Sequence, residues 1–117
     1  MNSYEKTCLA VKALDSKKAR DISLLKIEDL TVISDYFIIA TAGSSTQMRA
    51  LADEVEFVLK EKDILPLHTE GDTSSPWLLL DYGDMVVHIF LEDSRMFYSL
   101  ERLWSDATEI SVEEILK

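Results

Sequence analysis

Two apolar runs around a short polar turn constrain the fold of this chain more than any other feature. Residues 77–80 (WLLL) and 85–91 (MVVHIFL) flank the tetrapeptide DYGD. Both runs have the length and the large side chains typical of buried strands. Gly83 can adopt the positive φ that a hairpin loop of this length often requires. The stretch therefore predicts an antiparallel hairpin, although its Asp, Tyr and His residues are also types found in active sites.

The rest of the chain predicts alternating helices and strands. Residues 3–15 predict a helix, residues 22–27 and 36–42 predict strands, and Ser44 with Gln47 forms a capping box that opens a second helix ending near Lys62. The first helix repeats apolar residues at helical spacing (Tyr4, Cys8, Val11, Leu14), and the second does the same (Met48, Leu51, Ala52, Val55, Leu59).

The second half predicts shorter elements around the hairpin. Residues 64–68 form a short extended segment broken by Pro66, and residues 70–75 form a polar loop. Asp93 or Ser94 can cap a last helix that runs to Trp104, with an inner stripe of Phe97, Leu100 and Trp104. A weak capping box at residues 111–114 predicts a turn or short helix.

This order predicts an α/β (α+β) fold in which helices flank one mixed β-sheet. The 117 residues are expected to form a single domain, with a core over residues 3–107 and a short tail at 108–117.

No apolar run approaches the roughly 20 residues of a membrane span, and the N-terminus lacks the apolar region of a signal peptide. One cysteine, Cys8, allows no intrachain disulfide, which fits a reducing cytoplasm. We expect the Cys8 side chain to pack in the hydrophobic core, on the apolar face of its helix.

The charge balance argues against binding driven by nucleic-acid phosphates. Twelve basic side chains stand against 22 acidic ones, a formal charge of −10. Phosphate binding needs clustered Lys and Arg. An acidic domain instead favours a basic protein partner, or serves solubility alone.

The motifs for catalysis are incomplete. Gly43 and Ser44 end a strand and open a helix, as in the phosphate-binding turn of nucleotidyltransferases. That chemistry also needs two carboxylates at alternate positions of a following strand, but Asp53 and Glu54 are adjacent within the predicted helix. The two histidines show no metal-ligand spacing, and no serine lies in a nucleophile elbow. We therefore expect no catalytic residue, no metal and no cofactor.

Aromatic residues concentrate in the last third of the chain. Trp77, Tyr82, Tyr98 and Trp104 all fall there, and Trp and Tyr are favoured anchors of protein interfaces. Trp77 opens a short strand and Tyr82 lies at a predicted loop tip. The hairpin and the last helix could present one aromatic, acidic surface, or these side chains could simply pack on neighbouring loops.

Three segments in order resemble the ribosomal silencing factors, also called the Iojap-related family. They are residues 29–55 (DLTVISDYFIIATAGSSTQMRALADEV), 77–90 (WLLLDYGDMVVHIF) and 95–107 (RMFYSLERLWSDA). The resemblance implies a nucleotidyltransferase-like fold without the catalytic carboxylates. It implies docking to the large ribosomal subunit through large-subunit ribosomal protein fourteen. The docked factor would block joining of the small subunit and repress translation in a bacterial cytoplasm.

The resemblance also implies an interface. Its motifs fall on the hairpin residues Trp77, Leu79, Asp81, Tyr82, Asp84 and His88, and on the helix residues Arg95, Phe97, Tyr98 and Glu101. Trp77 and Tyr82 are the expected main contacts. Two alternatives stay open: a large-subunit assembly factor using the same surface, and a nucleotidyltransferase-like enzyme. A homodimer of the free protein is also compatible with this surface.

Overall fold

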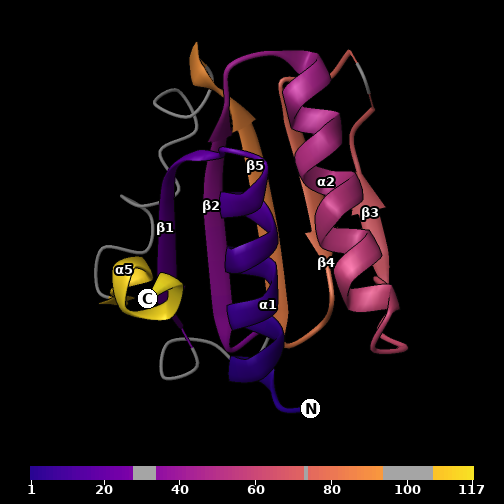
Figure 1. Cartoon of the computed structure of the whole chain (residues 1–117). Helices are drawn as coiled ribbons and strands as arrows, with labels where there is room; N and C mark the ends of the chain where they lie inside the picture. Colours follow the sequence, from indigo (N-terminus) through magenta and orange to yellow (C-terminus); the bar gives the residue numbers. More distant parts are fainter. Residues whose placement is uncertain (28–33, 73, 94–106) are drawn as a thin grey trace.

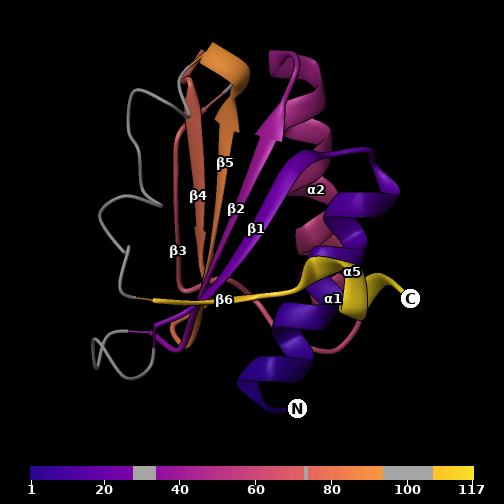
Figure 2. The same cartoon turned by 90° about the vertical axis from the view of Figure 1, so that its left-hand side faces the viewer.

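The chain folds into one sheet with helices packed against it. The computed structural model describes residues 1–27, 34–72, 74–93 and 107–117. The elements in order are α1 (Ser3–Ser16), β1 (Arg20–Lys26), β2 (Tyr36–Ala42), α2 (Ser45–Lys60), β3 (His68–Glu70), β4 (Trp77–Asp81), β5 (Met85–Leu91), β6 (Thr108–Ile110) and α5 (Val112–Leu116). Figure 1 labels all of them except β6, which is labelled in Figure 2.

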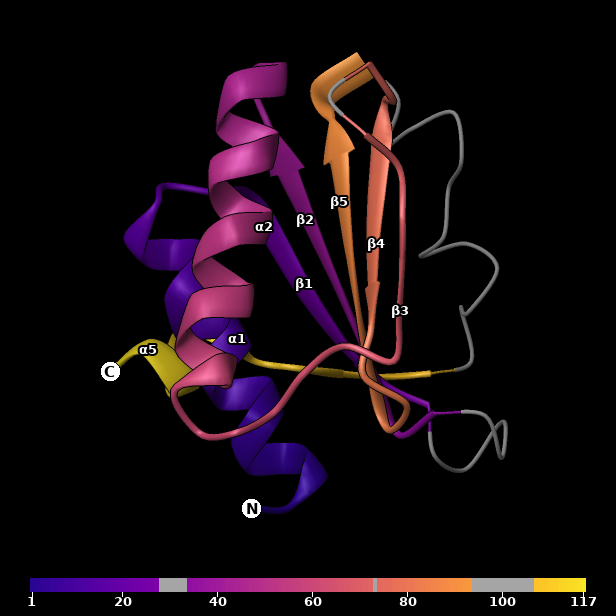
Figure 3. The same ribbon diagram turned by 90° about the vertical axis from the view of Figure 1, so that its right-hand side faces the viewer.

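The six strands form a single mixed sheet in the order β3-β4-β5-β2-β1-β6. The two central strands, β2 and β5, are parallel, and every other neighbouring pair is antiparallel. The helix α2 provides the first part of the connection between the parallel strands. All three described helices lie on the same side of the sheet (Figure 2), and β3 forms one outer edge (Figure 3). The predicted mixed α+β architecture is confirmed.

Both long helices begin at capped N-termini. The Ser44 side chain accepts a hydrogen bond from Gln47 N at 3.1 Å, which confirms the predicted start of α2. At α1 the cap is a reciprocal pair that we did not predict, in which Asn2 and Glu5 each accept from the other's backbone N–H.

Gln47 connects the start of α2 to the end of α1. Its Oε1 accepts from Gly43 N at 2.7 Å, and its Nε2 donates to the carbonyl oxygens of Lys17 and Lys18 at 3.3 and 3.0 Å. The Gly43–Ser44 turn is therefore fixed by contacts within the protein.

The period-two alternation of the strands divides the buried residues into two cores. Between sheet and helices lies the main core, to which β2 contributes Tyr36, Ile38, Ala40 and Ala42. On the opposite face, Leu25, Ile27, Ile39 and Phe90 form a second core against which Phe37, Trp77 and Ala107 pack. Both faces of the central strands are buried, as expected for the parallel part of a sheet.

Sequence expectations for the edge strand, the C-terminal segment and the first helix differ from the structure. The edge strand begins at His68 and not at residue 64, because Pro66 has no N–H and regular pairing with β4 follows it. The segment at 108–117 is not only a tail: β6 pairs with β1, and its predicted short helix, α5, packs on α1. Tyr4 is 43% exposed, so it does not belong to the buried stripe of α1.

The predicted last helix runs from Asp93 or Ser94 to Trp104, and all of it except Asp93 lies outside the described residues. Cys8 is half-buried on α1.

Candidate functional site

The hairpin places Trp77 at the start of β4, on the sheet face opposite the helices. It pairs with Phe90 of β5, and the two rings stack with centroids 5.1 Å apart and planes inclined by 20°. Phe90 is fully buried and Trp77 is half-buried. The indole therefore rests on a rigid base while part of its surface stays accessible.

His88 lies beside Trp77 on the same face. The Trp77 indole N–H donates to His88 Nδ1 at 3.2 Å. The imidazole meets Phe37 edge-on, with centroids 4.9 Å apart, and lies nearly parallel to Phe90 at 6.4 Å. Trp77, Phe90, His88 and Phe37 are hereafter the aromatic cluster. They come from three adjacent strands, so the fold assembles them from separate parts of the sequence.

The environment keeps His88 neutral. Burial lowers its pKa to about 4, an effect partly offset by the negative charge of Asp81. Because Nδ1 accepts the indole hydrogen, the proton of the neutral ring resides on Nε2. Within the described part of the chain, this buried Nε2 has no hydrogen-bond partner.

Stability should fall when the pH drops through the range between the two pKa values of His88. The unfolded chain binds the proton near the ordinary value of 6.5 and the folded chain only near 4. Below the higher value the unfolded state therefore binds more protons, which favours unfolding. From about pH 7 to about pH 5 we expect a loss of about 2 kcal/mol. Urea unfolding of the protein and of His88→Asn, which lacks this proton site, would measure it. An equal loss in both proteins would contradict the assignment.

Tyr82 does not lie exposed at a loop tip, and that expectation is wrong. Its side chain is 5% exposed and belongs to the main core under the helices. Burial raises the pKa of Tyr82, with a further contribution from Glu56 of α2. Tyr82 continues the alternation of Leu78 and Leu80, which face the helices. Counting this alternation past the end of the strand could have placed Tyr82 in the core.

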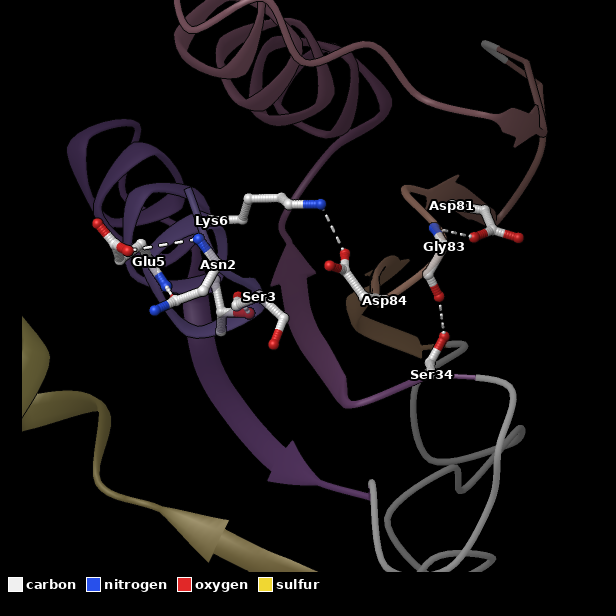
Figure 4. A network of polar contacts seen from close by, with 9 residues as sticks. Asn2, Ser3, Glu5, Lys6, Ser34, Asp81, Gly83 and Asp84 are labelled. Carbon is white, nitrogen blue, oxygen red and sulfur yellow. Dashed lines mark hydrogen bonds and ion pairs between the residues drawn. The ribbon is translucent and has the colours of Figure 1, made fainter.

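The two acids of the hairpin turn have partners inside the protein. Asp81 Oδ1 accepts from Gly83 N at 2.8 Å, and Gly83 itself has a φ of 89°. Asp84 forms a 2.8 Å ion pair with Lys6 of α1 (Figure 4). Ser34 donates to the carbonyl oxygen of Gly83 at 2.6 Å. Asp81 and Asp84 therefore stabilise the turn and tie it to α1, which the sequence did not indicate.

The remaining predicted interface residues divide into two groups. Leu79 is half-buried and pairs with His88 across the hairpin, so it lies on the face of the aromatic cluster. The others, Arg95, Phe97, Tyr98 and Glu101, lie outside the described residues. The predicted interface did not include Phe37 or Phe90, although the alternation of side chains along each strand places both on this face.

Among the described residues, the structure does not bring together the features of a nucleotidyltransferase site. Gly43 N already donates to Gln47, and Asp53 accepts two hydrogen bonds from Arg49 one helical turn away. No group of three or more His, Cys, Asp or Glu side chains suited to a metal ion occurs in the part of the chain that the structure describes. Likewise, none of the helices described is long and apolar enough to cross a membrane.

Fold and site together define the class of this protein: a small α+β domain whose described helices lie on one face of a mixed sheet and whose aromatic cluster lies on the other. The chain belongs to the ribosomal silencing factor family, since the model of the family described as "Ribosomal silencing factor during starvation" matches residues 1–117.

Individual relatives agree with this assignment. A ribosomal silencing factor of Halalkalibacterium halodurans is 38% identical over 116 residues, which cover 99% of each chain. A crystal structure of protein CV0518 from Chromobacterium violaceum superposes with a TM-score of 0.86 at 39% identity, covering 90% of this chain and 88% of that one. The mouse protein named "Mitochondrial assembly of ribosomal large subunit protein 1" is 33% identical over 103 residues, which cover 83% of this chain and 44% of that protein.

Proposed function

We propose that this protein docks on the large ribosomal subunit through large-subunit ribosomal protein fourteen. In the bacterial cytoplasm the docked protein blocks joining of the small subunit and so represses translation. The mechanism is steric and uses no catalytic residue, metal or cofactor. The observation that carries the proposal is the match to the silencing-factor family along the whole chain.

The aromatic cluster supports a docking surface on the face opposite the helices. Trp77 is half-buried against Phe90, and a rigid, partly exposed indole is typical of an interface anchor. Leu79 adds apolar surface beside it. Arg95, Phe97, Tyr98 and Glu101 complete the proposed contact set, as the family resemblance implies. His88 and Tyr82 are buried, so their contributions are indirect.

Charge supports a basic partner. The chain carries a formal charge of −10, which raises the rate of association with a basic ribosomal protein and disfavours direct contact with RNA phosphates. Asp84 is paired with the Lys6 ammonium, whereas Asp81 accepts only from a backbone N–H and keeps its negative charge as part of the overall field.

The test is a subunit-joining assay. The protein is added to purified mature large subunits before the small subunits, and the fraction of joined ribosomes is measured by sedimentation. Silencing predicts fewer joined ribosomes and pelleting of the protein with large subunits alone. Unchanged joining, or protein left in the supernatant at low salt, would overturn the proposal. Light scattering of the free protein tests whether a homodimer competes for the same surface.

Replacing Trp77 by alanine should weaken binding to large subunits by about 2 kcal/mol, or about 30-fold, as for a central interface anchor. Phe57→Ala is the matched control, because Phe57 is an aromatic residue of α2 that is 58% exposed and lies on the helical side of the molecule. The control should bind as the unmodified protein does. Pelleting over a range of subunit concentrations measures both, and equal affinities would exclude Trp77 from the interface.

A role in large-subunit assembly is the second candidate, favoured by the name of the mouse relative. It would use the same surface on an immature subunit. The joining assay separates the two functions, because an assembly factor leaves the joining of mature subunits unchanged.

A further inference from the structure

We infer that His88 is a positioning residue: its Nδ1 lone pair fixes the orientation of the Trp77 indole that docks the partner. The inference rests on the proposed function, because Trp77 is the anchor there. It adds a role for a side chain that is itself only 4% exposed and so reaches a partner only through Trp77.

Two contacts of the Trp77 indole favour one orientation of its ring. Stacking on Phe90, at 5.1 Å between centroids, fixes the plane of the ring, but a flat apolar support does not distinguish the ring from its flipped form. The hydrogen bond from Nε1 to His88 Nδ1, at 3.2 Å, does distinguish them, since an indole has a single N–H donor. Together the two contacts favour one plane and one direction of the side chain.

His88 is in turn held from two sides. Phe37 meets its ring edge-on at 4.9 Å, and Phe90 lies nearly parallel to it at 6.4 Å. The acceptor is therefore rigid before any partner arrives. Fixing an anchor in advance lowers the conformational entropy lost on binding.

The energetic cost of a histidine at this position also points to a role beyond packing. Its Nε2–H is buried and has no partner among the residues that the structure describes, which destabilises the fold. A phenylalanine would fill similar space without that cost. What phenylalanine cannot supply is the acceptor for Trp77.

Two substitutions separate positioning from packing. His88→Phe keeps a flat ring between Phe37 and Phe90 but removes the acceptor. His88→Asn keeps an acceptor, because its Oδ1 falls near the position of Nδ1, but removes the ring. Positioning predicts that the Asn variant binds large subunits nearly as the unmodified protein does, while the Phe variant binds about tenfold more weakly, the cost of one lost hydrogen bond. A packing role predicts the reverse order.

A measurement on the free protein makes the test independent of the ribosome. The Trp77 indole N–H signal, identified by its loss in Trp77→Phe, should lie downfield in the ¹H–¹⁵N NMR spectrum of the unmodified protein. It should stay downfield in His88→Asn and move upfield in His88→Phe. Trp104 provides an internal reference. If the signal does not respond to His88→Phe, the hydrogen bond is not what orients the ring and the inference is overturned.

Failure of the inference can be told apart from failure of the proposed function. If Trp77→Ala weakens binding as expected while His88→Phe binds as the unmodified protein does, the docking surface stands and the positioning role is overturned. If Trp77→Ala also binds normally, the proposed surface itself is wrong, and the positioning role for docking falls with it. Urea unfolding of each variant verifies that a loss of binding does not come from unfolding.

Discussion

Replacing Phe90 by alanine is expected to lower the free energy of unfolding by about 3 to 5 kcal/mol. Phe90 is fully buried, is among the largest such side chains in the described structure and joins the second core to the aromatic cluster. Alanine at this central strand would leave a cavity between Leu25, Ile39 and Trp77, and the sheet backbone cannot close it. Urea unfolding followed by far-UV circular dichroism measures the loss.

Phe57→Ala is again the matched control, because it removes the same atoms from an exposed position on α2. Its expected effect is within about 0.5 kcal/mol. If the two variants lost similar stability, burial on the second face of the sheet would not contribute as the structure implies. The free energy of unfolding of a domain is usually about 5 to 15 kcal/mol, so the Phe90→Ala variant would keep only part of it.

Gly71→Ala should destabilise the protein by about 2 to 4 kcal/mol. Gly71 follows β3 and has a φ of 97°, which side chains other than glycine rarely adopt. A Cβ atom there would lie 2.5 Å from the carbonyl oxygen of Trp77 and 2.7 Å from Leu78 Cδ2. Because the first of these contacts is with backbone, relief requires the start of β4 to move. The same shift should weaken docking by displacing Trp77.

Gly43→Ala is the control for this prediction. Its φ is not in the left-handed region, and an added Cβ would meet only the far ends of the Arg20 and Gln47 side chains, at 3.4 Å or more. We expect a change of less than about 1 kcal/mol in unfolding free energy. Thermal and urea unfolding of both alanine variants measure the contrast. Equal effects would show that close approach to Trp77 is not what requires glycine at position 71.

Local patterns were sufficient to predict most of the architecture. The Ser44–Gln47 cap and the apolar stripe of α2 are short-range signals, and the structure confirms both. The strand 36–42 and the hairpin were likewise predictable, because each is a run of large apolar residues with turn signals beside it. The strand β6 was not predictable, since its residues Thr108–Ile110 are mostly exposed and pair with β1 from far along the chain.

The candidate site was only partly predictable for the same reason. Trp77 could be identified from its residue type, but its contacts with Phe90 and His88 depend on the register between strands. The partners of Asp81 and Asp84 were missed because one is a backbone N–H and the other, Lys6, lies on α1. Its place in the hairpin loop suggested an exposed Tyr82, but the residue continues the alternation of Leu78 and Leu80 toward the helices and is buried.

The parallel pairing of β2 with β5 also has a kinetic consequence. Tyr36 aligns with Met85, and every residue of α2, β3 and β4 comes between them in the sequence. During synthesis the apolar edge of β2 is therefore made well before its partner. Contacts between residues so far apart in the sequence form slowly, and an apolar strand that is still unpaired is prone to associate with other chains. Until Leu91 has left the exit tunnel, the edge of β2 that faces β5 stays unpaired, because β1 occupies only the opposite edge and α1 and α2 cover only one face.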